Sequence, residues 1–297
     1  MDFTLNTYRK LLEALKDSFP RFYVFSEVIT GVPDRFLVLR HDVDRKPSNA
    51  LTLAGIESAY GIKASYHFRI GIIKDHGSIL REIADMGHEV AYHYEDLSEV
   101  CKNHRLTGRY LSEEIIHEAV ERFEANLELF RKFYPVTIIS MHGSPLSAID
   151  NRLLWKYYDY RINGIAGEPY FDIDVSDLLY LTDTGRRWDA DRSNIRDRGK
   201  HFSQSIEEDP YSEWVTRPVT GSLMRLTDEG KAFSAGNRFR TTSDIILSAS
   251  EKKLPQKVII NTHPQRWTDK SLPWIHELVF QSLKNQVKKV IQTNKTL

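Results

Sequence analysis

Short apolar runs alternate with amphipathic stretches along this chain, and that alternation limits the folds it can adopt. The first run, FLVLR (36–40), is typical of a strand buried on both faces of a parallel sheet. A stretch of helical periodicity follows at 47–60, with Pro47 at its start and Gly61 after its end. Strands that alternate with helices predict βαβ units and a parallel sheet.

The same pattern recurs to the end of the chain. Further strands are predicted at 63–68, 88–93, 136–141, 178–182 and 257–261. Helices are predicted at 4–17, 76–86, 110–133, 149–158, 241–252 and 271–293. About six or seven such units predict an α/β fold with a closed or partly closed barrel. A doubly wound open sheet is the alternative, and it would hold its ligands at the same strand ends.

Length and composition fit one globular domain. Of the 297 residues, 41% are hydrophobic and 28% are charged, which is ordinary for such a domain. We expect a single catalytic barrel over 1–297, with an N-terminal helix within 1–20. The stretch at about 184–240 is rich in charge near its start and lacks clear periodicity, so we expect it to cross the barrel mouth as a long active-site excursion.

The charge balance and the hydropathy of the chain limit which binding partners and which location we expect for it. Basic and acidic residues number 41 each, and because nucleic-acid-binding proteins usually carry a basic excess, we expect no nucleic-acid partner. The N-terminus lacks the apolar core of a signal peptide, and no stretch approaches the roughly 18–20 apolar residues that span a bilayer. We therefore expect a cytoplasmic protein without a transmembrane segment. The oligomeric state stays open.

Acidic and histidine residues lie where predicted strands end. They are Asp42, Asp44, His93, His142, Asp183 and His263. In a parallel barrel the C-terminal strand ends share one side, where active sites are found. We therefore expect these side chains to meet.

Asp42 and Asp44 are two residues apart, so on an extended segment both side chains point the same way. Two carboxylates facing one pocket suit metal binding, or one metal ligand beside one base. The alternative is a surface turn or a helix cap before Pro47.

The histidines after strands suit metal binding or proton transfer. His93 is a candidate ligand, and Glu95 is a candidate either for the metal or for orienting His93, unless it lies in an exposed acidic loop. His142 is a candidate ligand, substrate contact or turn residue. His263 suits proton donation to a leaving group near neutral pH, although it could simply bind backbone.

Arginine and tryptophan residues near two strand ends are candidate contacts for a sugar or an anion. With Asp183, which could instead form a turn with Gly185, the predicted substrate-binding residues are Asp183, Arg186, Trp188, Arg266 and Trp267. The alternative for the last pair is a buried tryptophan beside a surface arginine.

Four motifs in order resemble one known family. RHDVD (40–44), MGHEVAYHYEDL (86–97), SMHGSP (140–145) and INTHP (260–264) resemble motifs of the NodB-like polysaccharide deacetylases, carbohydrate esterase family four. They look most like its WbmS-like branch, which is associated with surface-polysaccharide gene clusters. The resemblance runs from about residue 36 to 267 and implies a distorted (β/α)7-type barrel.

In that family the first motif supplies a general base and a metal ligand, which match Asp42 and Asp44. Here Val43 separates the two aspartates, which are usually adjacent in the family. The family's late histidine, a general acid, matches His263. The family's Arg-Pro motif near the fourth strand has no clean match.

The family's second motif supplies two histidine ligands four residues apart. His93 matches the first, but the second falls on Leu97, which cannot bind metal. The resemblance therefore requires the third ligand to come from elsewhere, with Glu95 and His142 as the candidates.

The implied activity is metal-dependent hydrolysis of an N-acetyl-like group on an amino sugar of a surface polysaccharide or its precursor. The expected cofactor is a divalent metal, with Zn²⁺ preferred, and the expected substrate is a carbohydrate, a nucleotide sugar or a lipid-linked glycan. Two alternatives stay open: a small-molecule C–N amidohydrolase, and a non-catalytic glycan- or partner-binding barrel with a degenerate metal site. A glycosidase is disfavoured because Asp42 and Asp44 lie too close for an inverting pair.

Overall fold

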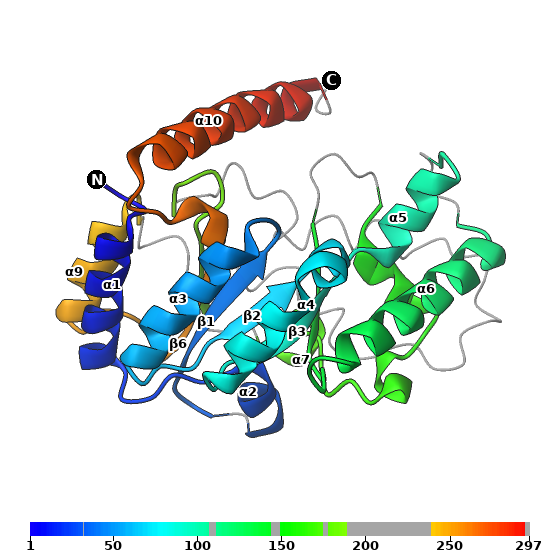
Figure 1. Ribbon diagram of the computed structural model, residues 1–297, viewed down its shortest axis with the longest axis horizontal. Helices are drawn as coiled ribbons and strands as arrows, with labels where there is room; N and C mark the ends of the chain where they lie inside the picture. Colours follow the sequence, from blue (N-terminus) through cyan, green and yellow to red (C-terminus); the bar gives the residue numbers. More distant parts are fainter. Residues whose placement is uncertain (32, 107–110, 144–148, 175–177, 189–238, 295–297) are drawn as a thin grey trace.

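One all-parallel sheet organises the described part of the chain, which is residues 1–31, 33–106, 111–143, 149–174, 178–188 and 239–294 of a computed structural model. Its strands are β1 (Phe36–Val43), β2 (Ser65–Phe68), β3 (Glu89–Tyr94), β4 (Ile139–Met141), β5 (Leu178–Thr182) and β6 (Lys257–Thr262). They pair in the order β4-β3-β2-β1-β6-β5, and Figure 1 labels β1, β2, β3 and β6. This is the cyclic strand order of a barrel that is open between β4 and β5.

The opening of the barrel is partly spanned by one short pairing. Gly167 forms an isolated parallel bridge with Ile138, on the side of β4 where a further strand would stand. The α/β class and the parallel, barrel-type sheet are therefore confirmed. The described residues contain six strands, at the six places where strands were predicted, whereas the family resemblance implies a barrel of seven.

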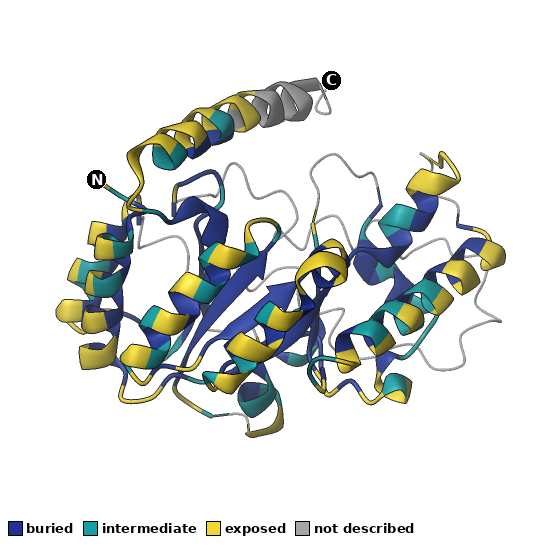
Figure 2. Ribbon diagram, in the orientation of Figure 1, coloured by how far each residue is buried: buried dark blue, intermediate teal, exposed yellow. Residues whose placement is uncertain are grey.

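Helices cover the outside of the sheet and turn their exposed faces to solvent (Figure 2). The helices are α1 (Leu5–Ser18), α2 (Phe25–Gly31), α3 (Pro47–Ala59), α4 (Ile70–Asp85), α5 (Asp96–Asn103), α6 (Glu113–Arg131), α7 (Pro169–Asp172), α9 (Thr242–Ser250) and α10 (Ser271–Asn294). Short 3-10 turns lie at Asn151–Lys156, Tyr160–Asn163 and Pro264–Arg266. Within the described residues, no helix has the length and apolar character that a bilayer crossing requires.

Local sequence signals explain where several helices begin. The Thr4 hydroxyl accepts a hydrogen bond from the Thr7 N–H and so caps α1, and the Ser112 hydroxyl caps α6 in the same way. The expected helix at 76–86 is longer than predicted, because α4 begins at Ile70 and passes through a non-helical residue at His76.

The predictions for the other segments differ in outcome. The segment expected to be helical at 149–158 forms only a 3-10 turn, and α2 and α5 were not predicted. Most of the expected excursion at 184–240 lies outside the described residues.

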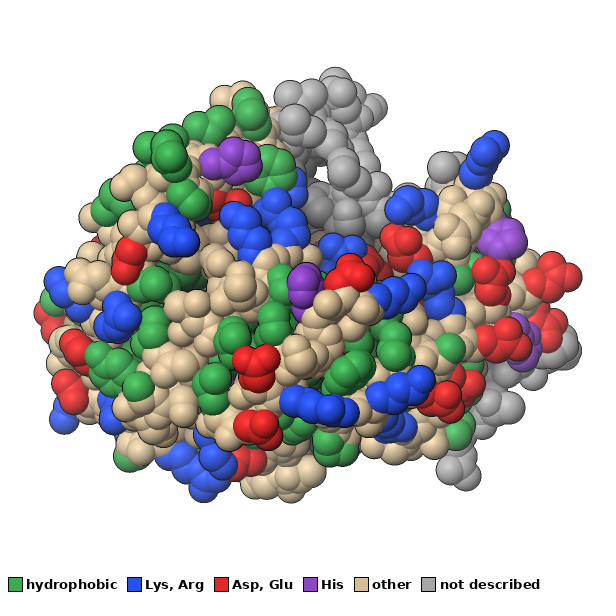
Figure 3. All heavy atoms as spheres, viewed as in Figure 1, with side chains coloured by type: hydrophobic (Ala, Val, Ile, Leu, Met, Phe, Trp, Pro, Cys, Tyr) green, Lys and Arg blue, Asp and Glu red, His purple; other side chains and the backbone are tan. Residues whose placement is uncertain are grey.

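On the face shown in Figure 3, basic and acidic side chains occur together over the helices.

The inside of the barrel is layered. Val38, Ala91 and Ile259 lie on β1, β3 and β6 and pack with Phe25 and Val28 of α2, which close one end of the barrel. Side chains alternate between the two faces of a strand, so residues two or four positions further along share this inner face. The polar residues of the candidate site stand on that inner face, above the apolar layer.

Candidate metal centre

Three side chains from the ends of β1, β3 and β4 meet above the apolar layer. Asp44 Oδ1 lies 4.0 Å from His93 Nε2 and 3.6 Å from His142 Nε2. One donor atom from each of the three residues lies within 4.8 Å of the other two. The structure thus brings together three of the four predicted metal ligands.

These three donors fit a divalent metal. Asp44 Oδ1 is buried and has no hydrogen-bond partner among the described residues, which leaves it available for a cation. Two ligand atoms bound about 2.0–2.1 Å from one tetrahedral Zn²⁺ lie roughly 3.3 Å apart. The separations from Asp44 Oδ1, at 3.6 Å to His142 and 4.0 Å to His93, are larger than this, so side-chain rotations would be needed to bring the atoms to bonding distance.

Both histidines present the same ring nitrogen to the centre. His93 Nδ1 donates to the Ser140 carbonyl at 3.0 Å, and His142 Nδ1 donates to Glu95 Oε2 at 2.9 Å. Each bond fixes the tautomer, so Nε2 carries the free lone pair. Burial lowers the pKa of His93 to about 4, which keeps its imidazole neutral and able to bind a metal at neutral pH.

Glu95 contacts His142 and lies outside the group of three donors, so its role as a metal ligand stays a prediction and an orienting role fits its contacts. Its carboxylate accepts two hydrogen bonds at Oε1 from Arg69, at 2.6 and 2.8 Å, besides the bond from His142. Burial acts to raise the pKa of Glu95, but His142 and Arg69 outweigh it and lower the pKa to about 2. Leu97, at the position that the resemblance gives to the family's second histidine, is buried in the hydrophobic core. The third donor atom beside Asp44 and His93 comes from His142 instead.

Asp42 stands beside the centre with both carboxylate oxygens engaged. Oδ1 accepts from Arg40 Nε at 2.7 Å, and Oδ2 accepts from Asn261 Nδ2 at 2.8 Å. Asp42 Oδ2 also lies 3.9 Å from His93 Nε2. Burial acts to raise the pKa of Asp42, but the Arg40 guanidinium and nearby histidines hold it well below its usual range. Asp42 is therefore an ionised carboxylate at neutral pH.

His263 approaches the centre from β6. Its Nε2 lies 3.9 Å from Asp44 Oδ2, and its Nδ1 donates to Asp183 Oδ1 at 2.6 Å. Asp183 Oδ2 also accepts from the His263 backbone N–H at 3.0 Å. The buried carboxylate of Asp183 thus fixes both the tautomer and the orientation of the imidazole, and leaves Nε2 facing the metal position.

A small cavity of about 90 Å³ opens onto this centre. A water occupies about 30 Å³ in the liquid, so the cavity suits a few waters or a small acyl group. Besides the residues already named, its lining is Met141, Gly143, Tyr170, Tyr180, Thr182 and Thr184.

Sequence reasoning missed these lining residues, and also Arg40 and Asn261. Period-two alternation carried the signal, because Arg40 and Asn261 each stand two residues before a predicted site residue. Tyr180 and Thr182 likewise alternate along the predicted strand 178–182.

The five predicted substrate-binding residues are buried, and none is among the described residues that line the cavity. Asp183 holds His263, and the Arg266 guanidinium donates to Asp183 in turn. Trp267 Nε1 donates to Asp183 Oδ2 at 3.1 Å. Arg266 and Trp267 thus hold Asp183 in place beside His263, and the substrate-binding role of these residues stays a prediction.

The other two of the five pack near the N-terminus. The Trp188 ring stacks on Phe3 with centroids 6.0 Å apart, and its Nε1 donates to Thr242 Oγ1 at 3.0 Å. The Arg186 guanidinium lies over the rings of Phe3 and Trp274. Both side chains are therefore part of the packing that joins the N-terminus to the C-terminal third of the chain.

No family model matches the sequence, and a search of curated proteins gave no significant match. Among solved structures, the chain is similar to a family 4 carbohydrate esterase from Bacillus anthracis, at 14% identity and a TM-score of 0.28, over 40% of this chain and 52% of that one. It is also similar to a CE4 family pseudoenzyme from Bacillus anthracis, at 11% identity and a TM-score of 0.38, over 85% of this chain and 61% of that one.

A third similar structure is the Xyl-CE4 domain of a multidomain xylanase from the hindgut metagenome of Trinervitermes trinervoides. The identity is 14% and the TM-score 0.36, over 86% of this chain and 85% of that domain. This chain thus spans about half of the first structure's chain, at 52%, and 61% of the second's. Because identities and TM-scores are this low, we infer the function from the residues of the site.

Proposed function

We propose that this protein is a metal-dependent hydrolase that removes an acyl group, of the N-acetyl kind, from an amino sugar. The observation that carries the proposal is the arrangement around the three donors Asp44, His93 and His142. An ionised carboxylate, Asp42, lies 3.9 Å from His93, and an imidazole, His263, lies 3.9 Å from Asp44. Metal-assisted acyl transfer to water uses this combination of a metal position, a base and an acid.

A divalent metal bound by Asp44, His93 and His142, for which Zn²⁺ is the first candidate, supplies a Lewis acid for the acyl carbonyl and lowers the pKa of the attacking water. Asp42 accepts the proton of that water. Arg40 and Asn261 hold the Asp42 carboxylate in place through the reaction.

The acid acts on the other side of the centre. His263 Nε2 gives a proton to the leaving amine nitrogen, which departs as a neutral amine. Asp183 stabilises the imidazolium form that precedes this transfer and keeps the proton-bearing Nε2 directed at the site.

The substrate class follows from the motifs and the cavity. The resemblance of RHDVD and the later motifs to the polysaccharide deacetylases favours an acylated amino sugar. Tyrosine and threonine side chains, including Tyr180 and Thr182, line the cavity and offer hydroxyl groups to a sugar. We propose a surface polysaccharide or its nucleotide-sugar or lipid-linked precursor as the natural substrate, with the whole chain as the catalytic domain and the cytoplasm as the location.

The alternative of a non-catalytic barrel depended on the missing histidine at Leu97. His142 offers a third donor atom beside Asp44 and His93, which supports the hydrolase over that alternative. The small-molecule amidohydrolase shares the same centre, and substrate profiling separates the two.

Metal content tests the proposal. We expect about one divalent metal ion per chain in protein purified without added metal, and its loss in Asp44→Ala and His93→Ala. The exposed residues Asp34 and His117 give matched controls, Asp34→Ala and His117→Ala, which should retain the metal. Release of acetate from a panel of N-acetylated amino sugars by the wild type, and not by Asp42→Ala, then tests the activity. Metal-free wild type, or metal unaffected by both site variants, contradicts the proposal.

A further inference from the structure

His67 is a buried side chain whose two ring nitrogens have no hydrogen-bond partner among the described residues. It lies on β2 and is fully buried. One face of its surroundings is apolar, since the Phe25 ring meets it edge-on with centroids 5.4 Å apart. Burial holds the pKa of His67 well below its usual value, so the imidazole is neutral. An unpaired polar group in such a place is costly to the fold and calls for a partner that binds there.

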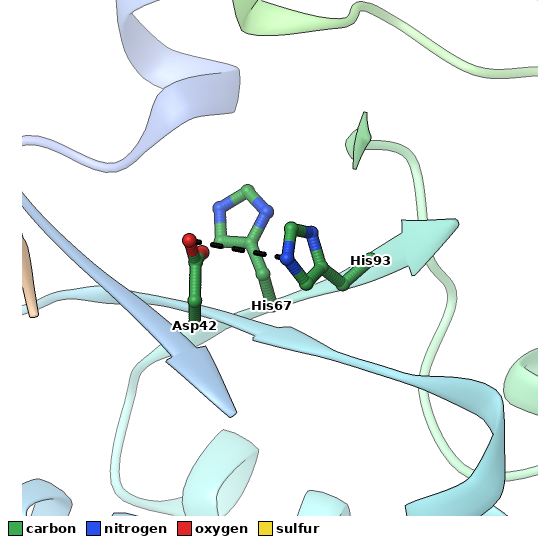
Figure 4. Close-up of side chains that lie close together, drawn as sticks. All are labelled: Asp42, His67 and His93. Carbon is green, nitrogen blue, oxygen red and sulfur yellow. Dashed lines mark ion pairs between the residues drawn. The ribbon is translucent and has the colours of Figure 1, made fainter. Parts of the chain in front are cut away.

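The other side of His67 faces the centre. In the parallel pairing of β1 and β2, His67 is the register partner of Asp42, and across β2 and β3 it is the partner of Ala91, two residues before His93. One donor atom from each of Asp42, His67 and His93 lies within 4.8 Å of the other two. Figure 4 shows the three side chains gathered together, with His67 between Asp42 and His93 in that view.

His93 belongs to this group and also to the outer group with Asp44 and His142. Its Nδ1 donates to the Ser140 carbonyl, so only Nε2 can bind a metal. That atom is almost equally far from the two carboxylates, 3.9 Å from Asp42 Oδ2 and 4.0 Å from Asp44 Oδ1. A single lone pair serves one metal ion at a time, so the two groups exclude each other.

We propose that Asp42, His67 and His93 form a second, inner position for the same divalent metal, which exchanges with the outer position. This inference rests on the proposed metal centre. The outer position is the stronger one, because Arg40 and Asn261 already bind the Asp42 oxygens, whereas Asp44 Oδ1 has no such competitor among the described residues. An ion in the inner position occupies the carboxylate that serves as base, so a chain loaded there is inactive.

Cobalt binding to the full-length, folded protein tests the inner position. Equilibrium dialysis and the visible absorption of bound Co²⁺ would be measured for the wild type, His142→Gln, His67→Leu and the double variant. We expect His142→Gln to weaken Co²⁺ binding by at least the roughly 10–100-fold that loss of a residue orienting a ligand costs, and still to bind about one ion per chain at saturation. The double variant should lose this residual binding, and His67→Leu alone should bind Co²⁺ within about two-fold of the wild type.

The leucine substitution is chosen because it removes two unpaired polar atoms and leaves an apolar side chain beside Phe25, so the variant should fold. His67→Gln serves as a second variant if leucine does not fit, and circular dichroism confirms folding in each case. The inference is overturned if His142→Gln binds no Co²⁺, or if the double variant binds it as well as His142→Gln does. Either result leaves the proposed function standing, whereas a wild type that binds no divalent metal removes both.

Discussion

Glu95 and His142 lie 47 residues apart in the chain, yet Glu95 Oε2 accepts a hydrogen bond from His142 Nδ1 at 2.9 Å. Arg69 holds the same carboxylate from the other side. A carboxylate behind a ligating histidine fixes the tautomer and the ring orientation and raises the basicity of the ligand. The acidic residue directly after β3 thus holds the histidine directly after β4 in the orientation that the proposed metal centre needs.

Removing the charge of Glu95 should weaken metal binding without abolishing it. We expect Glu95→Gln to raise the dissociation constant for Zn²⁺ by about 10–100-fold, because the three donor atoms remain but His142 is less firmly oriented. A competition titration against a chromophoric chelator measures this. Glu99→Gln, in the helix α5 that begins directly after Glu95 and paired with exposed Lys102, is the control and should bind Zn²⁺ normally. Complete loss of binding, as expected for Asp44→Ala, would show instead that Glu95 is itself a ligand.

Asp183 should act through His263. In Asp183→Asn the amide can donate to Nδ1, which favours the wrong tautomer and removes the charge that stabilises the imidazolium. We expect kcat to fall by about 10²–10⁴-fold with KM and metal content little changed. Steady-state kinetics and elemental analysis measure both, with Asp34→Asn as a surface control. A rise in KM at constant kcat would instead restore Asp183 as a substrate contact.

The charge of Arg40 should set the acid limb of the pH–rate profile. Arg40 holds the pKa of Asp42 low, so removing its positive charge raises that pKa, and the acid limb of kcat/KM moves to higher pH in Arg40→Gln. Loss of one partner of a buried pair also lowers the free energy of unfolding, by about 3–5 kcal/mol, so folding is checked first. Arg40→Lys keeps the charge and should return the limb toward its wild-type position. An acid limb that does not move in Arg40→Gln would show that Asp42 is not the titrating base.

Much of the fold could be predicted because β-strand and helix periodicities are local. The expected strand at 178–182 has the bounds of β5, and the helix expected at 110–133 is α6, which begins at Glu113 and ends at Arg131. Period-two alternation also explains why Asp42 and Asp44 both line the cavity, while His41, directly before Asp42, faces the other way and binds Glu57 at 2.7 Å. Because all six strands are parallel, their C-terminal ends lie on one side of the sheet.

The partners across strands could not be predicted in the same way. Nothing in the local pattern tells that His142 pairs with Glu95 or that Asp183 holds His263, since these contacts join segments 47 and 80 residues apart. Arginine and tryptophan were assigned to substrate from their chemistry alone. Their burial depends on packing against Phe3 and Asp183, which only the tertiary structure shows.

Trp188 should matter for stability and not for substrate binding. Its ring packs on Phe3 and its Nε1 donates to Thr242, with 4% of the residue exposed. We expect Trp188→Ala to lower the free energy of unfolding by about 3–5 kcal/mol, since it leaves a large cavity. Urea unfolding measures the loss, and Trp188→Phe should lose less because it keeps a ring on Phe3. A raised KM without loss of stability would contradict the packing role.

Glu168 should make stability depend on pH. It is fully buried, accepts from the Met141 N–H at 3.0 Å, and burial raises its pKa to about 7. The folded state therefore binds the proton more tightly than the unfolded chain, where the pKa is near 4.5. The resulting stabilisation is full below about pH 4.5 and is lost as the pH rises to about 7, an effect of about 3 kcal/mol.

Urea unfolding of wild type and Glu168→Gln at several pH values isolates this pH-dependent stabilisation, because glutamine does not titrate. The wild type should lose about this much relative to the variant between pH 4.5 and 7.5, whereas exposed Glu121→Gln should follow the wild type throughout. A difference between wild type and Glu168→Gln that stays constant with pH would mean that the fold stabilises the charged carboxylate as well as water does.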